Sequence, residues 1–81
     1  MYYVYLLESI QGPANRYVGF TTNDVPHRLA EHNEGKSVHT NKYKPWKCVA
    51  YFAFESREKA RRFEIYLKHG SGHAFAKKHL W

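Results

Sequence analysis

The feature that constrains this chain most is a pair of tyrosine-rich segments near its N-terminus, separated by residues that favour a turn. Residues 2–8 read YYVYLLE and residues 16–20 read RYVGF, and both are rich in aromatic and β-branched residues. Residues 9–15 (SIQGPAN) carry the Gly, Pro and Asn of a reversing loop. The first twenty residues therefore predict a β-hairpin, in which Tyr5 and Tyr17 lie side by side on adjacent strands.

The next segment, TTNDVPHRLAEHNEG, predicts a helix. Thr22 or Asn23 can cap its N-terminus, and Asp24 suits its first turn. Pro26 is tolerated there because the first helical N–H groups have no partner within the helix. Gly35 marks the end of the helix.

The second half of the chain predicts a basic loop, one more strand and two more helices. Residues 36–45 are polar and basic, whereas residues 46–55 are apolar on both faces and are expected to form the central strand of the sheet. Ser56 caps a helix that Gly70 closes, and residues 72–81 predict a short terminal helix. The order ββαβαα indicates an α+β fold with helices packed on a small sheet.

Length and charge limit the classes of function. The 81 residues leave room for one domain, 1–81. No apolar run is long enough to cross a membrane, no signal peptide is evident, and the single cysteine, Cys48, fits a reducing compartment, so a cytoplasmic location is expected. The 13 Lys and Arg exceed the 7 Asp and Glu by six charges. This surplus favours an anionic polymer such as nucleic acid, although small basic domains also bind acidic proteins.

One acidic residue falls on an apolar helix face. Ala60, Phe63 and Leu67 form one stripe of the second helix, and Glu64 lies within it. A carboxylate in such a place is costly unless it is paired, hydrogen-bonded or bound to metal. Glu64 therefore predicts either a partly buried ion pair with an Arg or Lys, or a metal ligand lining a cleft.

Two polar residues border the apolar stripe of the first helix. Arg28 and His32 are spaced i,i+4 beside Val25 and Leu29, so they lie one turn apart. Arg offers a planar fork of donors that suits phosphate oxygens, and His can move a proton near neutral pH. The alternative is an ordinary solvated face, since this helix is polar almost all round.

Each tyrosine alone is more often structural than catalytic. A phenol with a pKa near 10 is a poor base unless neighbouring cations lower that pKa. Arg28, His32 or a metal held by Glu64 could supply that charge to Tyr5 or Tyr17. Two phenols, a guanidinium and a carboxylate on separate elements favour a common site. No phosphate-binding glycine loop occurs, and the histidines lack metal-ligand spacing.

The ordered set of motifs resembles the GIY-YIG nuclease superfamily, which is named for two strand motifs about ten residues apart. Residues 3–5 (YVY) stand for the first motif and residues 17–19 (YVG) for the second. Residues 21–37 resemble the family's Arg-x₃-His helix, and residues 44–72 resemble its third strand and acidic helix. The likeness covers essentially the whole chain. It is greatest to small stand-alone bacterial members, which resemble the N-terminal module of the nucleotide-excision-repair incision subunit.

The resemblance implies a three-stranded antiparallel sheet between helices, with one divalent ion, Mg²⁺ or Mn²⁺, on a glutamate. Matched by position, the family's functional residues are Tyr5, Tyr17, Gly19, Arg28, His32 and, as metal ligand, Glu64. Two departures occur. Tyr3 replaces the glycine of the first motif, and only Ser71 or His73 stands where larger members use a polar residue after the acidic helix.

The resemblance further implies a metal-dependent DNA endonuclease that leaves a 5′-phosphate and a 3′-hydroxyl and acts in DNA repair or processing. Arg28 would clamp a phosphate oxygen, Tyr5 or Tyr17 would activate water, and His32 would hold the phenol or relay its proton. Backbone contacts would come from Lys36, Lys42, Lys44 and the Arg57–Arg62 face. A protein partner would supply targeting. The alternatives are a non-catalytic nucleic-acid-binding module on a nuclease fold and a basic protein-interaction domain.

Overall fold

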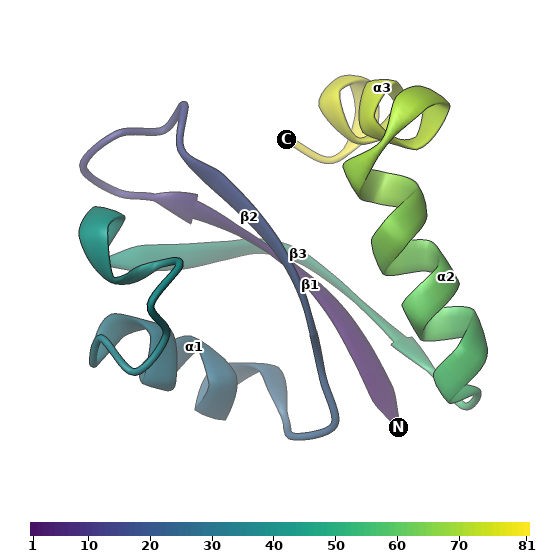
Figure 1. The fold of residues 1–81 in the computed structure, drawn as a ribbon, viewed down its shortest axis with the longest axis horizontal. Helices are drawn as coiled ribbons and strands as arrows, with labels where there is room; N and C mark the ends of the chain where they lie inside the picture. The colour runs from purple at the N-terminus through teal and green to yellow at the C-terminus, as the bar shows by residue number, and fades with distance from the viewer.

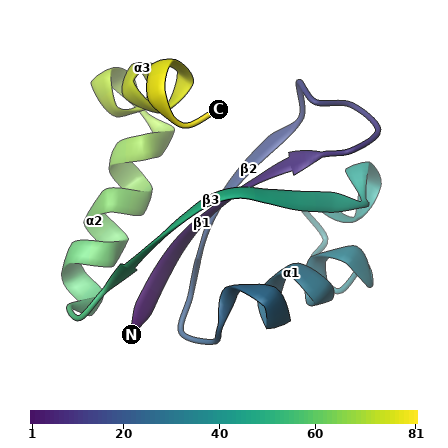
Figure 2. The same ribbon diagram turned by 180° about the vertical axis from the view of Figure 1, so that it is seen from behind.

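Three antiparallel strands form a sheet in the order β2-β1-β3, with helices on both faces. Figures 1 and 2 show α1 on one side of the sheet and α2 and α3 on the other. The computed structural model describes residues 1–81. The elements are β1 Tyr2–Ser9, β2 Arg16–Thr21, α1 Val25–Asn33, η1 Asn41–Tyr43 (a 3₁₀ turn), β3 Trp46–Phe54, α2 Arg57–Lys68 and α3 Gly70–His79. The predicted α+β class and the hairpin of β1 and β2 are confirmed.

Strand β1, not β3, is the central strand, so the sequence-based prediction for residues 46–55 is wrong. Four consecutive residues of β1, Val4 to Leu7, are at most 1% exposed, because helices cover both faces of this strand. In β3 exposed and partly buried residues alternate, and Val49 and Tyr51 are 37% and 59% exposed. The apolar run therefore belongs to an edge strand whose outward side chains reach solvent.

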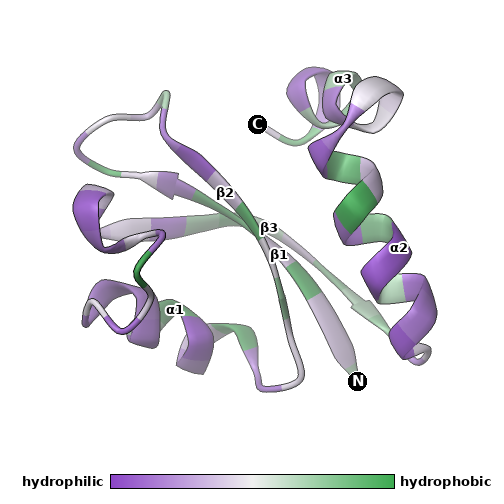
Figure 3. Cartoon of the chain, viewed as in Figure 1, coloured by the Kyte–Doolittle hydropathy of each residue, from purple (hydrophilic) through white to green (hydrophobic).

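The two faces of the sheet carry separate apolar clusters. Val4 and Leu6 pack with α2 and α3 through Ala60, Leu67 and Ala76. The opposite face packs against α1 through Tyr5, Leu7, Val25 and Trp46. Tyr5 therefore points toward α1, whereas its neighbours Val4 and Leu6 point toward α2. Figure 3 shows that the middle of β1 is hydrophobic, whereas its C-terminal end is hydrophilic.

The helix boundaries follow local capping, with two differences from the sequence-based prediction. Asp24, rather than Thr22 or Asn23, caps α1, because its Oδ1 accepts the N–H of His27 at 2.8 Å. Ser56 caps α2 as predicted.

The junction between the last two helices also differs. Helix α2 ends at Lys68, His69 is extended, and α3 begins at Gly70, two residues earlier than expected. Gly70 has φ +51°, a conformation that glycine adopts without a Cβ clash. Gly70 and Gly72 therefore lie within α3 and do not break it. Leu80 and Trp81 pack on the core, whereas Phe75 is 40% exposed.

The loop after α1 is fastened to β3 by side chains. The Asn33 amide pairs with both backbone groups of Trp46: its Nδ2 donates to the carbonyl at 3.1 Å, and its Oδ1 accepts the N–H at 2.6 Å. The Trp46 indole N–H donates to the Thr40 carbonyl at 2.8 Å. These bonds hold Thr40 beside α1. No helix of the structure combines the length and the hydropathy that crossing a membrane requires.

Candidate active site at the edge of strand β2

Strand pairing places the Tyr5 ring over a residue that has no side chain. Tyr5 of β1 is directly opposite Gly19 of β2. A Cβ at position 19 would overlap Cζ and Oη of Tyr5 and would lie 2.8 Å from Cε2 of Tyr17. The glycine therefore lets the Tyr5 phenol extend toward the free edge of β2, with the Tyr17 ring beside it at a centroid distance of 6.2 Å.

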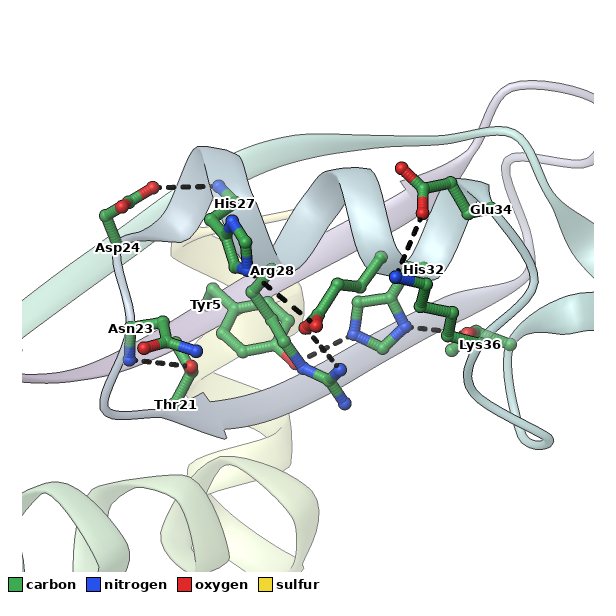
Figure 4. Close-up of polar contacts among 11 residues, drawn as sticks. Tyr5, Thr21, Asn23, Asp24, His27, Arg28, His32, Glu34 and Lys36 are labelled. Carbon is green, nitrogen blue, oxygen red and sulfur yellow. Dashed lines mark hydrogen bonds and ion pairs between the residues drawn. The ribbon is translucent and has the colours of Figure 1, made fainter.

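The Tyr5 hydroxyl is the centre of a buried hydrogen-bond chain. The Arg28 Nε–H donates to it at 3.2 Å, and it lies 2.8 Å from Nε2 of His32. On the other side of the imidazole, Nδ1 lies 2.6 Å from Oγ1 of Thr40. Figure 4 shows the Tyr5, Arg28 and His32 side chains pointing toward one another. Tyr5, His32 and Thr40 are at most 1% exposed.

The hydrogen-bond inventory assigns the direction of this chain. Arg28 can only donate, so the proton of a neutral Tyr5 hydroxyl has one partner, Nε2 of His32. Nε2 is then the acceptor of a neutral imidazole, and Nδ1–H donates to Thr40. The proton of the Tyr5 phenol therefore points at Nε2 of His32.

Burial sets the protonation states of this chain. Burial raises the pKa of Tyr5 to about 12; the Arg28 hydrogen bond opposes this, and the charges of Tyr17 and Glu64 add to it. Burial, with Arg28 nearby, lowers the pKa of His32 to about 4. Arg28 lowers the Tyr5 pKa as predicted, but the loss of hydration outweighs it, so the net pKa lies above the ordinary value rather than below it.

Arg28 is held from a second direction. Its Nη1 lies 3.0 Å from Oε1 of Glu31, one turn further along α1. The hydrogen bond from Arg28 lowers the pKa of this carboxyl. Arg28 thus has a fixed orientation, and it lines a polar hollow of about 390 Å³ together with Glu31 and Arg57.

Tyr17 is placed differently from Tyr5. It is only partly buried, and its ring meets the His32 ring edge-on at 5.1 Å between centroids. It lines a second hollow, of about 310 Å³, with Lys68 and His73 among the other lining residues. Of the two phenols, Tyr17 is therefore the one that borders open space. His73 reaches this hollow from α3, whereas Ser71 does not line it.

Glu64 lies across β2 from the Tyr5 cluster. Its side chain is 11% exposed, with Oε1 3.2 Å from Nη1 of Arg61 and Oε2 3.1 Å from Nζ of Lys68. It makes no contact with Arg28 or Tyr5, because α2 packs on the face of the sheet opposite α1. The structure thus brings together Tyr5, Tyr17, Arg28 and His32, and it places Glu64 nearby as the partly buried ion pair that the sequence allowed.

The donor set suits one kind of metal site only. No three His, Cys, Asp or Glu side chains lie close enough together to bind an ion by themselves. Mg²⁺ and Mn²⁺ accept a single carboxylate when water and substrate phosphate oxygens complete the octahedron. The Glu64 carboxylate fits such a site, provided that Arg61 and Lys68 release its oxygens.

The basic residues predicted to hold a nucleic-acid backbone are the three lysines of the loop after α1 and the arginines of α2. Lys36 forms an ion pair with Glu34, and Lys42 lies over the Tyr43 ring. Neither these two nor Lys44 lines either hollow. The Arg57–Arg62 face also divides. Arg57 and Arg61 lie over the Phe20 ring, at 5.3 and 4.8 Å from its centroid, whereas Arg62 pairs with Glu58 in solvent.

Two residues of the cluster were not predicted from the sequence. Thr40 lies in a polar loop and has no local pattern that singles it out. Glu31 reads as a solvated helix residue, although its i,i+3 spacing from Arg28 is a signal of pairing that could have been used.

Comparison with known proteins places the chain in a family. The family model described as the GIY-YIG catalytic domain matches residues 1–78 of this chain. The UPF0213 protein BH0048 of Halalkalibacterium halodurans is 42% identical over 69 residues, which are 84% of this chain and 70% of that protein. The structure is similar to the solution NMR structure of the UPF0213 protein BH0048 from Bacillus halodurans, with TM-score 0.54 and 38% identity, covering 95% of this chain and 81% of the other.

A more distant relative carries an enzymatic name. The structure-specific endonuclease subunit SLX1 homolog of Giardia intestinalis is 33% identical over 66 residues, which are 76% of this chain but only 18% of that protein.

Proposed function

Because this chain belongs to the GIY-YIG family of nuclease domains, we propose that it hydrolyses phosphodiester bonds in DNA, leaving a 5′-phosphate and a 3′-hydroxyl. The observation that carries the proposal is the convergence of Arg28, Tyr5, His32 and Tyr17 at the edge of β2, with a carboxylate across that strand. We propose the whole chain, 1–81, as one domain.

In this proposal Arg28 contacts the scissile phosphate. Its Nε and one Nη are committed to Tyr5 and Glu31, and the remaining N–H groups of the guanidinium are free to donate to a non-bridging oxygen. Such a fixed donor stabilises the charge that builds on the phosphate in the transition state.

The two tyrosines take different roles. Tyr17 borders the open hollow that Lys68 also lines, so we propose that Tyr17 is the phenol that activates the attacking water. Tyr5 is fully buried with its hydroxyl engaged on both sides, so it is a positioning residue that orients Arg28 and His32. In this proposal His32 holds the Tyr5 phenol by accepting its proton in a hydrogen bond.

Glu64 is the proposed ligand of Mg²⁺ or Mn²⁺. A divalent ion bound there would neutralise charge on the phosphate and on the leaving 3′-oxygen. Glu64 itself must release Arg61 and Lys68 to bind that ion. Each of these two cations has further N–H groups that can contact phosphate oxygens with or without the ion.

A nicking assay on plasmid and branched DNA with added Mn²⁺ tests this proposal. We expect Glu64→Gln and Arg28→Gln to abolish cleavage while the circular dichroism spectrum stays unchanged. Cleavage by Glu64→Gln at the wild-type rate would refute the metal role.

The alternative is a binding module without catalysis, which the two ion pairs of Glu64 favour because they satisfy the carboxylate without metal. In that case adding Mn²⁺ would change the thermal unfolding midpoint of neither the wild type nor Glu64→Gln. One relative is named as a structure-specific endonuclease subunit, so we include branched DNA among the substrates to be tested and propose that a partner protein supplies targeting. A role in DNA repair or processing is part of the same proposal.

A further inference from the structure

Two hollows lie along the free edge of β2, one toward each end of the strand. The hollow of about 390 Å³, called here the Arg57 hollow, lies between the end of β2, α1 and the start of α2, and Phe20, Arg28 and Arg57 are among its walls. The hollow of about 310 Å³, called here the Lys68 hollow, lies between the start of β2, the end of α2 and α3. Lys68, Tyr17 and His73 are among its walls.

Helix α2 connects the two hollows with a line of charged groups. It runs beside β2 in the opposite direction (Figure 1). Arg57 lies by Phe20 near one end of β2, and Lys68 lies by Tyr17 near the other. Between them, Glu64 is bonded to Arg61 on the Phe20 side and to Lys68 on the other. Phe20 and Tyr17 are three residues apart, about 10 Å along a strand.

Both hollows combine cations with aromatic rings. The Phe20 ring carries the guanidiniums of Arg57 and Arg61. The Lys68 hollow contains Tyr17 and Trp81, and the Trp81 ring lies beneath the Arg16 guanidinium at 5.1 Å. Positive charge that follows a backbone, together with aromatic rings covered by guanidinium planes on which bases can stack, is typical of single-strand binding.

We propose that one unpaired strand of nucleic acid lies along the free edge of β2, filling both hollows, with the phosphodiester to be cut between them at Glu64. Arg57 and Lys68 bind the phosphates on the two sides of that bond. This inference rests on the proposed nuclease function and adds the substrate class, a single-stranded segment, and its path across the molecule.

Helix α2 also supplies matched controls. Lys59 is exposed and lines neither hollow, so Lys59→Gln removes the same charge as Lys68→Gln from the same helix. Arg62 is 77% exposed and pairs only with Glu58, so Arg62→Gln is the counterpart of Arg57→Gln.

The test measures binding without cleavage. Fluorescence anisotropy, in EDTA, follows a labelled oligo(dT) and a hairpin duplex of equal charge. We expect Arg57→Gln and Lys68→Gln each to weaken oligo(dT) binding several-fold and to reduce the slope of log K against log salt by about 0.7. The two control variants should bind as the wild type does, and the duplex should bind more weakly.

Three results would overturn the path: equal losses in the controls, a loss from only one of the two hollows, or duplex binding as tight as oligo(dT) binding. Failure of the path is distinguishable from failure of the proposed function. A wild type that binds in this pattern but cuts nothing with Mn²⁺ retains the path and loses the nuclease. A wild type that cuts, with both hollow variants binding normally, retains the nuclease and loses the path.

Discussion

Acid should destabilise this protein through one buried imidazole. His32 is fully buried, with Nε2 accepting from Tyr5 and Nδ1 donating to Thr40. Arg28 lies on the same helix and disfavours a second positive charge, and only Glu31 favours it. Protonation would therefore break the Tyr5 bond, because Nε2 would become a donor opposite a hydroxyl proton.

The pKa gives the sign and size of the effect. The pKa of His32 is about 4 in the folded chain, against an ordinary value of 6.5. The unfolded state therefore binds more protons, so stability is complete above pH 6.5 and is lost as pH falls toward 4. This difference corresponds to a loss of about 1 kcal/mol between pH 7 and 5.5, and of about 3 kcal/mol by pH 4.

Urea unfolding at pH 7, 5.5 and 4 measures the loss, with His32→Gln as the reference. Glutamine can accept from Tyr5 but does not titrate, so carboxylate effects common to both proteins cancel in the difference. His27→Gln, a change of an exposed histidine on the same helix, should behave as the wild type does. Equal acid losses in the wild type and His32→Gln, or an NMR titration of His32 near pH 6.5, would refute the reasoning.

Three further variants test the architecture by urea unfolding. Gly19→Ala should lower stability by about 1–3 kcal/mol, because the new methyl overlaps the Tyr5 ring, and no loss would mean that the ring can move aside. Thr40→Val keeps the shape but leaves the buried Nδ1–H of His32 without an acceptor, which should cost about 1–3 kcal/mol. Ser56→Ala removes the cap of α2 and should lower the free energy of unfolding by about 1 kcal/mol. Ser56→Thr keeps a capping hydroxyl, so it should retain most of that stability, and an equal loss in both variants would contradict the capping role.

Local chemistry predicted much of the fold. The Gly-Pro-Asn loop predicted the hairpin, and Ser56 predicted the start of α2. The position of β3 could not be predicted in the same way, because nine residues with few polar side chains are compatible with a central or an edge strand. The deciding signal lay in β1, where Val4 to Leu7 have no alternation and are buried on both faces.

The candidate site was predictable only where helix or strand periodicity applies. Two patterns predicted that four residues lie together: the i,i+4 spacing of Arg28 and His32, and the positions of Tyr5 and Tyr17 on adjacent strands. Thr40 depends on a loop folding back on α1, a contact that spacing does not encode. The pKa of Tyr5 was mispredicted because the sequence shows which cations are near but not how completely water is excluded.

The bond between the Trp46 indole and the Thr40 carbonyl gives the protein an internal optical reporter. Trp46 is 4% exposed, so its emission is expected to be blue while the loop is closed and to shift red when Thr40 departs. In a Trp81→Phe background, where Trp46 is the only fluorophore of its kind, stopped-flow emission would time the opening of the histidine's environment separately from global unfolding.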